Sequence, residues 1–171
     1  SDLDLTIEIR TKSANRSPFN KLIPNENTIF AWTLSPQGIA EVFEHNTPSF
    51  MQRLSCIQEV IQKGFPVRLC FDPVIYTEHW KKLYCEMIET TFSMIPGSRI
   101  KDVSIGVFRV SRDYMKQMRK QRPDSLIIQY PFENENGVFH YGQKRSKEMI
   151  NFIYEKINRI IPEYRIFVWE V

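Results

Sequence analysis

The sequence predicts an α/β fold with mostly parallel strands and helical crossovers. Short runs rich in β-branched and aromatic residues alternate with longer segments in which apolar residues recur every three or four positions. The predicted strands carry few charges, as is typical of parallel strands covered by helices, and the connections are long enough for right-handed crossovers. At 171 residues, the chain has the length of one domain or of one piece of a larger domain.

The first third of the chain predicts two strands and a short helix. Apolar and polar residues alternate over 3–10, which predicts a strand. Residues 11–27 are rich in Ser, Asn, Pro and Lys and predict a long loop with at most one helical turn. The near-continuous apolar run at 28–34 is typical of a strand buried on both faces. Ser35-Pro36 combines a capping residue with proline at the first helical position, and predicts a short helix to about Glu44.

The next helix and strand have clear boundaries in the sequence. Thr47-Pro48-Ser49 is a second helix-start signal, and the apolar positions that follow it predict a helix ending at Gly64. Residues 67–71 form an apolar strand. We expect this strand to end at Asp72-Pro73, because proline cannot continue either kind of element.

Another helix, strand and helix follow in that order. The helix begins around Trp80 and ends before Pro96-Gly97, and residues 103–108 then form an apolar strand. Ser111 is a suitable cap for a helix that extends to about Gln121.

The carboxyl-terminal part predicts one strong helix between less regular segments. Residues 126–130 predict a short strand, and the polar stretch 133–145 predicts a surface loop or hairpin. Ser146 is expected to cap the final helix, which ends at Pro162, and residues 165–169 close the chain as a strand.

Composition excludes several classes of protein. With 42% hydrophobic and 25% charged residues, the chain is neither a disordered tail, nor a coiled coil, nor a disulfide scaffold. No apolar run approaches the roughly 20 residues that span a bilayer, so no membrane partner is expected. The start of the chain resembles no secretory signal, and its three cysteines are an odd number, so a reducing, cytoplasmic location is expected. A net charge of +3 permits nucleic-acid contact without arguing for it.

The cysteines and histidines predict no metal site. The cysteines at 56, 70 and 85 are too widely spaced for a zinc or iron–sulfur site, and we interpret each as a buried packing residue. The histidines at 45, 79 and 140 lie in separate segments and are interpreted as surface or turn residues. The sequence also contains no Gly-rich phosphate loop, nucleophile elbow or His-Glu-x-x-His motif, so no catalytic residue is assigned.

Polar residues at the carboxyl ends of the predicted strands are the candidates for a ligand site, because parallel α/β sheets bind ligands there. These residues are Lys12, Thr33, Ser35, Asp72 and Arg109. Together they suit a zwitterionic or phosphorylated ligand. Purely structural roles would explain these residues about as well. Ser35 would cap a helix, Asp72 would begin a turn, and Lys12 and Arg109 would be solvated surface residues.

Several strings, taken in order, carry a family resemblance. They are Glu8 to Lys12, Thr28 to Pro36, Phe43 to Ser49 with Arg53, Gly64 to Val67 with Asp72 to Ile75, Trp80 with Tyr84, and Val103 to Arg109. In this order and spacing, the segment from Glu8 to Asp113 resembles the second half of the spore photoproduct lyase family of radical SAM proteins.

The resemblance implies a partial (β/α) barrel that uses a [4Fe-4S] cluster to cleave S-adenosylmethionine (AdoMet) to a 5′-deoxyadenosyl radical, which in the lyase reverses a thymine dimer in spore DNA. It implies that Lys12 contacts AdoMet, that Thr33 stands where the family has a serine with the same role, and that Asp72 lines the same pocket. The family's cluster-binding Cys-x3-Cys-x2-Cys loop has no counterpart here.

Residues 1–171 are therefore expected to be a single-domain C-terminal fragment of a larger radical SAM-type barrel. Alone, it is expected to bind neither cluster nor AdoMet and to be inactive, and its partner would be the missing N-terminal half. Two alternatives stay open: a non-catalytic α/β binding domain, and a split enzyme whose other half is a separate chain. A half barrel also leaves two sheet edges and part of an apolar interior uncovered, which predicts self-association.

The resemblance also implies a DNA-binding face, with DNA as a partner. The family's basic, tyrosine- and glycine-rich stretch is represented here only by the shorter segment His140 to Arg145. The candidates are Arg109, Arg112, Tyr141, Lys144 and Arg145, with Tyr141 expected to stack on a base. The spacing of the basic residues at 112, 116, 119 and 120 fits an ordinary exposed helix face equally well.

Overall fold

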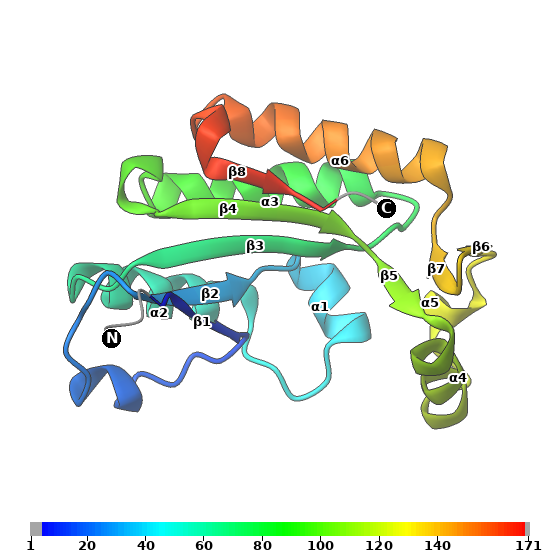
Figure 1. Cartoon of the computed structure of the whole chain (residues 1–171), viewed down its shortest axis with the longest axis horizontal. Coiled ribbons are helices and arrows are strands. Elements are labelled where there is room, and N and C mark those ends of the chain that lie inside the picture. Colours follow the sequence, from blue (N-terminus) through cyan, green and yellow to red (C-terminus); the bar gives the residue numbers. More distant parts are fainter. Residues whose placement is uncertain (1–4, 170–171) are drawn as a thin grey trace.

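A five-stranded parallel sheet forms the centre of the computed structural model, which describes residues 5–169 (Figure 1). The strand order is β1-β2-β3-β4-β8, so strands successive along the chain lie side by side. The strands are β1 (Ile7–Thr11), β2 (Thr28–Thr33), β3 (Val67–Val74), β4 (Asp102–Val107) and β8 (Ile166–Val168). This order confirms the predicted α/β fold with parallel strands and helical crossovers. Residues 3 and 4 of the predicted first strand lie outside the described residues.

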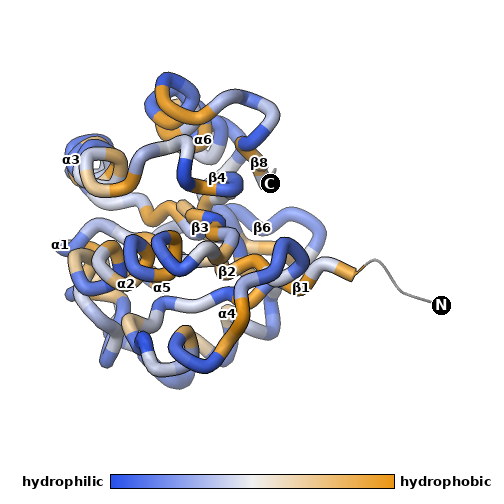
Figure 2. The backbone as a smooth tube through the Cα atoms, turned by 90° about the vertical axis from the view of Figure 1, so that its left-hand side faces the viewer, coloured by the Kyte–Doolittle hydropathy of each residue, from blue (hydrophilic) through white to orange (hydrophobic). Residues whose placement is uncertain are grey.

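Three long helices cover one side of this sheet. They are α2 (Phe50–Gln62), α3 (Trp80–Met94) and α6 (Gln143–Asn158). Figure 2 shows these helices gathered on one side of the strands, while the opposite side of the sheet carries none of them. The core lies between the sheet and the helices. Its fully buried members include Leu69 on β3, Ile105 on β4, Leu54 on α2 and Ile153 on α6.

Shorter elements extend the carboxyl ends of the strands. Helix α1 (Gln37–Phe43) follows β2, and α4 (Arg112–Gln121) and α5 (Leu126–Gln129) follow β4. A small antiparallel sheet of order β5-β7-β6 packs beside them; its strands are β5 (Arg109–Ser111), β6 (Glu133–Glu135) and β7 (Val138–His140). Single turns of 3-10 helix, η1 (Ser17–Asn20), η2 (Gly97–Arg99) and η3 (Glu163–Arg165), complete the fold. The hairpin predicted within 133–145 and the helical turn predicted within 11–27 are confirmed.

The open side of the sheet is polar. Register partners in a parallel sheet share a face, and alternate residues of each strand point to opposite faces. Arg68 is in register with Asp102 and Ala31 with Arg68, whereas Leu69 is in register with the core residue Val103. The open face therefore carries mainly charged and small side chains, but it also carries Phe167, which is in register with Ser104 on β4 and is 48% exposed.

Two predicted boundaries differ from the structure. Strand β3 continues through Asp72 and Pro73 to Val74, with a shift of register between Phe71 and Val74 and a cis Asp72-Pro73 peptide bond. The predicted strand at 126–130 is the short helix α5 instead, with Ile128 buried. The run of apolar residues was too short for periodicity to separate a strand from a single helical turn.

Two helix caps also differ from the prediction, at α1 and α6. Pro36, not Ser35, is the N-cap of α1. The start signal at 47–49 is confirmed, because Ser49 caps α2 in a reciprocal pair with Gln52. Helix α6 begins before Ser146, with Gly142 at its N-cap. The cap predicted at Ser111 is confirmed, because its hydroxyl accepts the backbone N–H of Tyr114 at 3.3 Å.

The cysteines and histidines mostly behave as expected. Cys56 and Cys70 are fully buried, and burial raises the pKa of both thiols, whereas Cys85 is only half-buried. His45 and His79 are exposed, but His140 is 2% exposed, which corrects its interpretation as a surface residue. Within residues 5–169, no helix is long and apolar enough to cross a membrane.

The two edges of the sheet expose apolar side chains. Leu5, Ile7 and Ile9 are 60%, 57% and 43% exposed at the β1 edge, and Phe167 and Trp169 are 48% and 49% exposed at the β8 edge. Unpaired strand edges with apolar side chains are templates for pairing with another chain.

We expect the chain to self-associate in sedimentation velocity as its concentration rises, and the double variant Ile7→Lys, Ile9→Lys to shift it towards the monomer, because charge on an edge opposes pairing. A chain that stays monomeric at every concentration would contradict the expectation.

Candidate functional site

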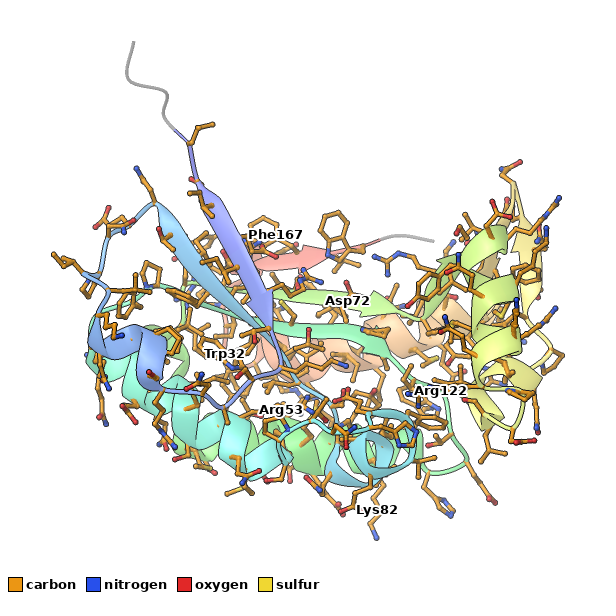
Figure 3. All side chains as sticks on the ribbon, turned by 90° about the horizontal axis from the view of Figure 1, so that it is seen from below. Trp32, Arg53, Asp72, Lys82, Arg122 and Phe167 are labelled. Carbon is orange, nitrogen blue, oxygen red and sulfur yellow. The ribbon has the colours of Figure 1, made fainter. Side chains whose placement is uncertain are left out.

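The carboxyl ends of the strands carry two clusters of charged side chains. We call the first the Glu44 cluster; it comprises Lys12, Ser35, Glu44, Thr47 and Arg53. The second, the Asp72 cluster, comprises Arg10, Asp72 and Arg109. In Figure 3, Arg53 lies on the helix side of the strands, whereas Asp72 lies towards the open side.

The Glu44 carboxylate joins the ends of two strands to two helices. Lys12, directly after β1, places its Nζ 2.7 Å from Glu44 Oε1, and Ser35, after β2, donates its hydroxyl to the same oxygen at 2.6 Å. Arg53 of α2 donates from Nη2 to Glu44 Oε2. Glu44 itself is the C-cap of α1. One carboxylate therefore connects β1, β2, α1 and α2.

Arg53 is fully buried, and its guanidinium donates hydrogen bonds to several acceptors. Besides Glu44, it donates from Nη2 to Thr47 Oγ1 at 2.8 Å, from Nε to the Pro48 carbonyl at 3.1 Å, and from Nη1 to the Thr33 carbonyl at 3.2 Å. A buried cation is tolerated only when it is paired and hydrogen-bonded in this way.

The Glu44 cluster has one more cation than anion. Burial raises the pKa of the Glu44 carboxyl, but hydrogen bonds from Lys12, Ser35 and Arg53 outweigh this effect, and the net result is a lowered pKa. Arg53 is enclosed, whereas the Lys12 side chain is 37% exposed. The excess positive charge is therefore exposed to solvent at Lys12.

The ion pairs of the Asp72 cluster link β1, β3 and β5 across the open face of the sheet. Asp72 on β3 pairs with Arg10 on β1 through an Nη1–Oδ2 distance of 3.4 Å, and with Arg109 on β5 through an Nη1–Oδ1 distance of 3.2 Å. Arg109 also donates to the Val107 carbonyl at 3.0 Å. Gly106 lies directly beneath this pair, because a Cβ there would come within 2.7 Å of both Asp72 Oδ1 and Arg109 Nη1.

A further ion-pair network occupies the same face nearer the amino ends of the strands. Arg68 binds Asp102 through two hydrogen bonds and also contacts Glu8, and its guanidinium lies 5.4 Å from the centre of the Phe167 ring. Hydrogen bonding to Asp102 raises the pKa of Arg68. The open face is thus lined by alternating charges from β1, β3 and β4.

The predicted cofactor residues lie at the same end of the sheet but in different settings. Lys12 belongs to the Glu44 cluster and Asp72 to its own cluster. Thr33 is 5% exposed and reaches the Glu44 cluster through its backbone carbonyl, which accepts from Arg53.

The predicted DNA-binding residues all follow the carboxyl ends of the strands, but with different exposure. Arg109 is engaged by Asp72, and Arg112 and Lys144 are exposed. Arg145 lies over the Tyr76 ring at 4.4 Å and pairs with Glu148. Tyr141 is 5% exposed, its hydroxyl accepts the Tyr76 N–H at 3.0 Å, and other aromatic rings surround it, so its ring is not free to stack on a base.

The residues described do not fit a cluster or metal. Within residues 5–169, no three His, Cys, Asp or Glu side chains are grouped as a metal site requires. Two of the three cysteines are fully buried, on β3 and α2, and the third lies on α3. These thiols cannot converge on one iron–sulfur cluster.

Sequence reasoning assigned no role to Glu44, Arg53 or Arg10. A signal for Arg53 was present, because it occupies an apolar-stripe position of its helix, three residues after Phe50 and four before Ile57. An arginine on a buried helix face requires an acid partner, which points to a nearby carboxylate. Nothing in the sequence distinguished Arg10 from the other charged residues of an alternating strand.

Comparisons with known proteins identify what this arrangement is similar to. The sequence profile of the family described as spore photoproduct lyase matches residues 7–168. A curated relative, spore photoproduct lyase of Clostridium acetobutylicum, is 23% identical over 133 residues, which are 78% of this chain and 38% of that protein.

Solved structures of spore photoproduct lyase share the fold. One, complexed with dinucleoside spore photoproduct, gives a TM-score of 0.80 at 17% identity, and another, a mutant with bound AdoMet and dinucleoside spore photoproduct, gives 0.79 at 17% identity. Each match covers 95% of this chain and 50% of the solved chain. The chain therefore spans about half the length of these structures.

The burial of Arg53 predicts how the cluster responds to mutation. Glu44→Met leaves a buried guanidinium without its charge partner, and we expect the free energy of unfolding to fall by about 3–5 kcal/mol. The control Lys12→Met removes a partly exposed partner and is expected to cost less than about 1 kcal/mol. Urea denaturation measures both, and equal losses would contradict the assigned roles.

The lowered pKa of Glu44 predicts a pH dependence. A carboxyl whose pKa is lower in the folded chain than its ordinary value of 4.5 stabilises the fold fully above that value and loses this contribution as the pH falls below it. The difference in unfolding free energy between wild type and Glu44→Gln should therefore shrink as the pH drops from about 5 to about 3. A difference that is constant over this range would show that Glu44 does not titrate as argued.

Proposed function

This chain belongs to the spore photoproduct lyase family, and on that basis we propose that it forms the carboxyl-terminal half of a radical SAM barrel. In this proposal the open face of the sheet lines the interior of the barrel, and the carboxyl ends of β1, β2 and β3 form one wall of an AdoMet pocket. The rest of the barrel is supplied by polypeptide beyond the half that this chain spans.

The observation that carries the proposal is the excess positive charge of the Glu44 cluster. One carboxylate serves two cations there, and the exposed one is Lys12 at the end of β1. The carboxylate of the methionine moiety is a suitable partner for that ammonium group, because a partly buried anion needs a charged donor. Glu44 holds the lysine in place without neutralising the cluster.

Thr33 and Asp72 have narrower roles in this proposal. Thr33 lies at the end of β2, and its carbonyl is held by Arg53, so the strand end that faces AdoMet is rigid. Asp72 lines the pocket while it holds Arg10 and Arg109, whose remaining N–H groups are available to polar atoms of a ligand. When bound, AdoMet and its cluster would supply the radical chemistry; residues 5–169 offer no ligands for that cluster.

For the substrate, we propose a lesion in DNA, approached by Arg112, Lys144 and Arg145 with Arg109 at the inner edge. These side chains follow the carboxyl ends of the strands, the same side as the pocket. The burial of Tyr141 among Tyr130, Phe132 and its other aromatic neighbours supports a structural role for this ring.

Anaerobic iron–sulfur reconstitution of the full gene product that contains this chain tests the proposal. We expect formation of 5′-deoxyadenosine from AdoMet, and none from the 171-residue chain alone. Lys12→Ala should raise the AdoMet concentration needed for half-maximal rate by about tenfold, whereas Lys12→Arg should retain most binding.

A full gene product that binds no cluster and releases no deoxyadenosine would overturn the proposal. That result would favour the alternative of a non-catalytic α/β binding domain. As a matched control, Lys82→Ala changes a lysine on the far side of the helices, shown at the lower edge of Figure 3, and should leave the rate unchanged.

A further inference from the structure

His140 is a buried titratable side chain that joins the small antiparallel sheet to the start of α6. It stands on β7, is 2% exposed, and belongs to neither the Glu44 cluster nor the Asp72 cluster. Its Nδ1 accepts the backbone N–H of Gly142 at 3.0 Å, and Gly142 is the N-cap of α6. The Gly142 carbonyl in turn accepts the N–H of Ser146 at 2.9 Å. The imidazole is therefore tied directly to the first turn of this helix.

The hydrogen bond from Gly142 assigns the protonation state of the ring. A ring nitrogen that accepts a hydrogen bond carries no proton, so the proton of the neutral imidazole is on Nε2. Nε2 has no hydrogen-bond partner among residues 5–169, and it lies 3.6 Å from Glu135 Oε2 on β6. That oxygen accepts a hydrogen bond from Gln143 Nε2 at 3.3 Å instead. The fold as described thus contains a neutral His140.

Charged residues of the two neighbouring strands share the face of His140. Residues directly opposite one another in antiparallel strands lie on the same face, and His140 is in register with Arg109 on β5 and with Glu133 on β6. The guanidinium of Arg109 is engaged by Asp72. Glu133 lies against the helix start, because a Cβ at Gly142 would collide with its carboxylate.

The helices next to β7 contribute basic residues. Arg119 of α4 lies 5.6 Å from the centre of the Phe139 ring, which is on the opposite face of β7 from His140, because successive strand residues alternate in direction. The first turn of α6 carries Lys144 and Arg145, and Arg145 pairs with Glu148. On the face of His140, the two glutamates of β6 therefore favour a second proton on the ring, whereas the Gly142 N–H opposes it.

We propose that His140 is a pH-sensitive latch whose protonation breaks the hydrogen bond to Gly142 and releases the first turn of α6 from the β6–β7 hairpin. Imidazolium has two N–H donors and no acceptor, so a protonated Nδ1 cannot bind the Gly142 N–H. The proton on Nε2 would then be drawn to Glu135. Histidine is the side chain whose charge ordinarily changes between about pH 5 and pH 8. Such a switch requires neither AdoMet nor DNA, so it stands separately from the proposed function.

The direction of the pH effect follows from the proton balance. The latched ring holds one proton and the released ring holds two, so a lower pH favours release. Over the range in which the released ring is charged, the ratio of released to latched molecules should rise by up to about tenfold per pH unit. Release moves Lys144 and Arg145, because both belong to the turn that Gly142 begins.

Nuclear magnetic resonance of the ¹⁵N-labelled chain between about pH 7.5 and pH 5 tests the latch. As the pH falls, the Gly142 amide proton should move upfield, and its protection against hydrogen exchange, corrected for the intrinsic rate at each pH, should fall by about tenfold or more. The amides of β3 in the centre of the sheet should keep their protection over the same range.

Two variants separate the ring from its surroundings. In His140→Asn, the side-chain oxygen can accept the N–H two residues on, as in an Asx turn, but it does not titrate, so Gly142 should stay protected at every pH. His79→Asn changes an exposed histidine and should retain the wild-type response. Glu135→Gln removes an acid that favours the charged ring and should move the response to lower pH, whereas Glu155→Gln, on the exposed side of α6, should not.

Three outcomes would overturn the proposal. They are a Gly142 amide whose shift and protection are constant over this pH range, an identical pH response in wild type and His140→Asn, and a loss of protection in β3 that accompanies the loss at Gly142. Circular dichroism shows whether His140→Asn folds. If it does not, Glu135→Gln decides the question, because it leaves the ring and its hydrogen bond in place, and an unshifted response in that variant would also contradict the latch.

Discussion

The buried guanidinium of Arg53 is the constraint on which the carboxyl end of the sheet depends. It donates to a carboxylate, a hydroxyl and two backbone carbonyls, and these acceptors belong to α1, the loop before α2, and the end of β2. The reciprocal cap between Ser49 and Gln52 fixes the start of α2 just before Arg53. Because the penalty for an unpaired buried cation is large, these segments have one arrangement in which all acceptors are in place. The ion pair with Glu44 holds Lys12 in position within that arrangement.

In the proposed barrel, the open face of the sheet would line the interior. Its strands present Arg10, Arg68 and Asp72, which pair with charged residues on other strands of the sheet, so the face is mainly polar although the same strands are apolar on the helix side. Gly106 permits the Asp72–Arg109 pair to lie directly on β4, where any side chain would displace it. Exposed apolar side chains include Ile7 and Ile9 at the β1 edge and Phe167 at the β8 edge.

The existence of most elements was predictable from the sequence, but several of their boundaries and caps were not. Helices α2, α3 and α6 and strands β2 and β4 carry long or strongly patterned signals, and their existence was predictable. Asp72-Pro73 was expected to end its strand, but β3 continues past it, because pairing with β4 resumes at Val74 after the register shift. Ser146 was expected to cap α6, but it is buried inside the helix with its hydroxyl unpaired, and the positive φ of Gly142 sets the helix start.

By itself, the sequence determined the parallel α/β class, most of the helices, and the strand ends at which Lys12, Thr33 and Asp72 stand, because hydrophobic periodicity and the geometry of parallel sheets are local or general properties. Only the tertiary structure decided which charges meet. Lys12 and Glu44 are 32 residues apart, and Arg10 and Asp72 are 62 apart. Such pairs form because packing brings distant segments within hydrogen-bond distance, and one sequence without the fold does not specify those contacts. The same holds for Tyr141, whose ring the fold encloses among aromatic neighbours.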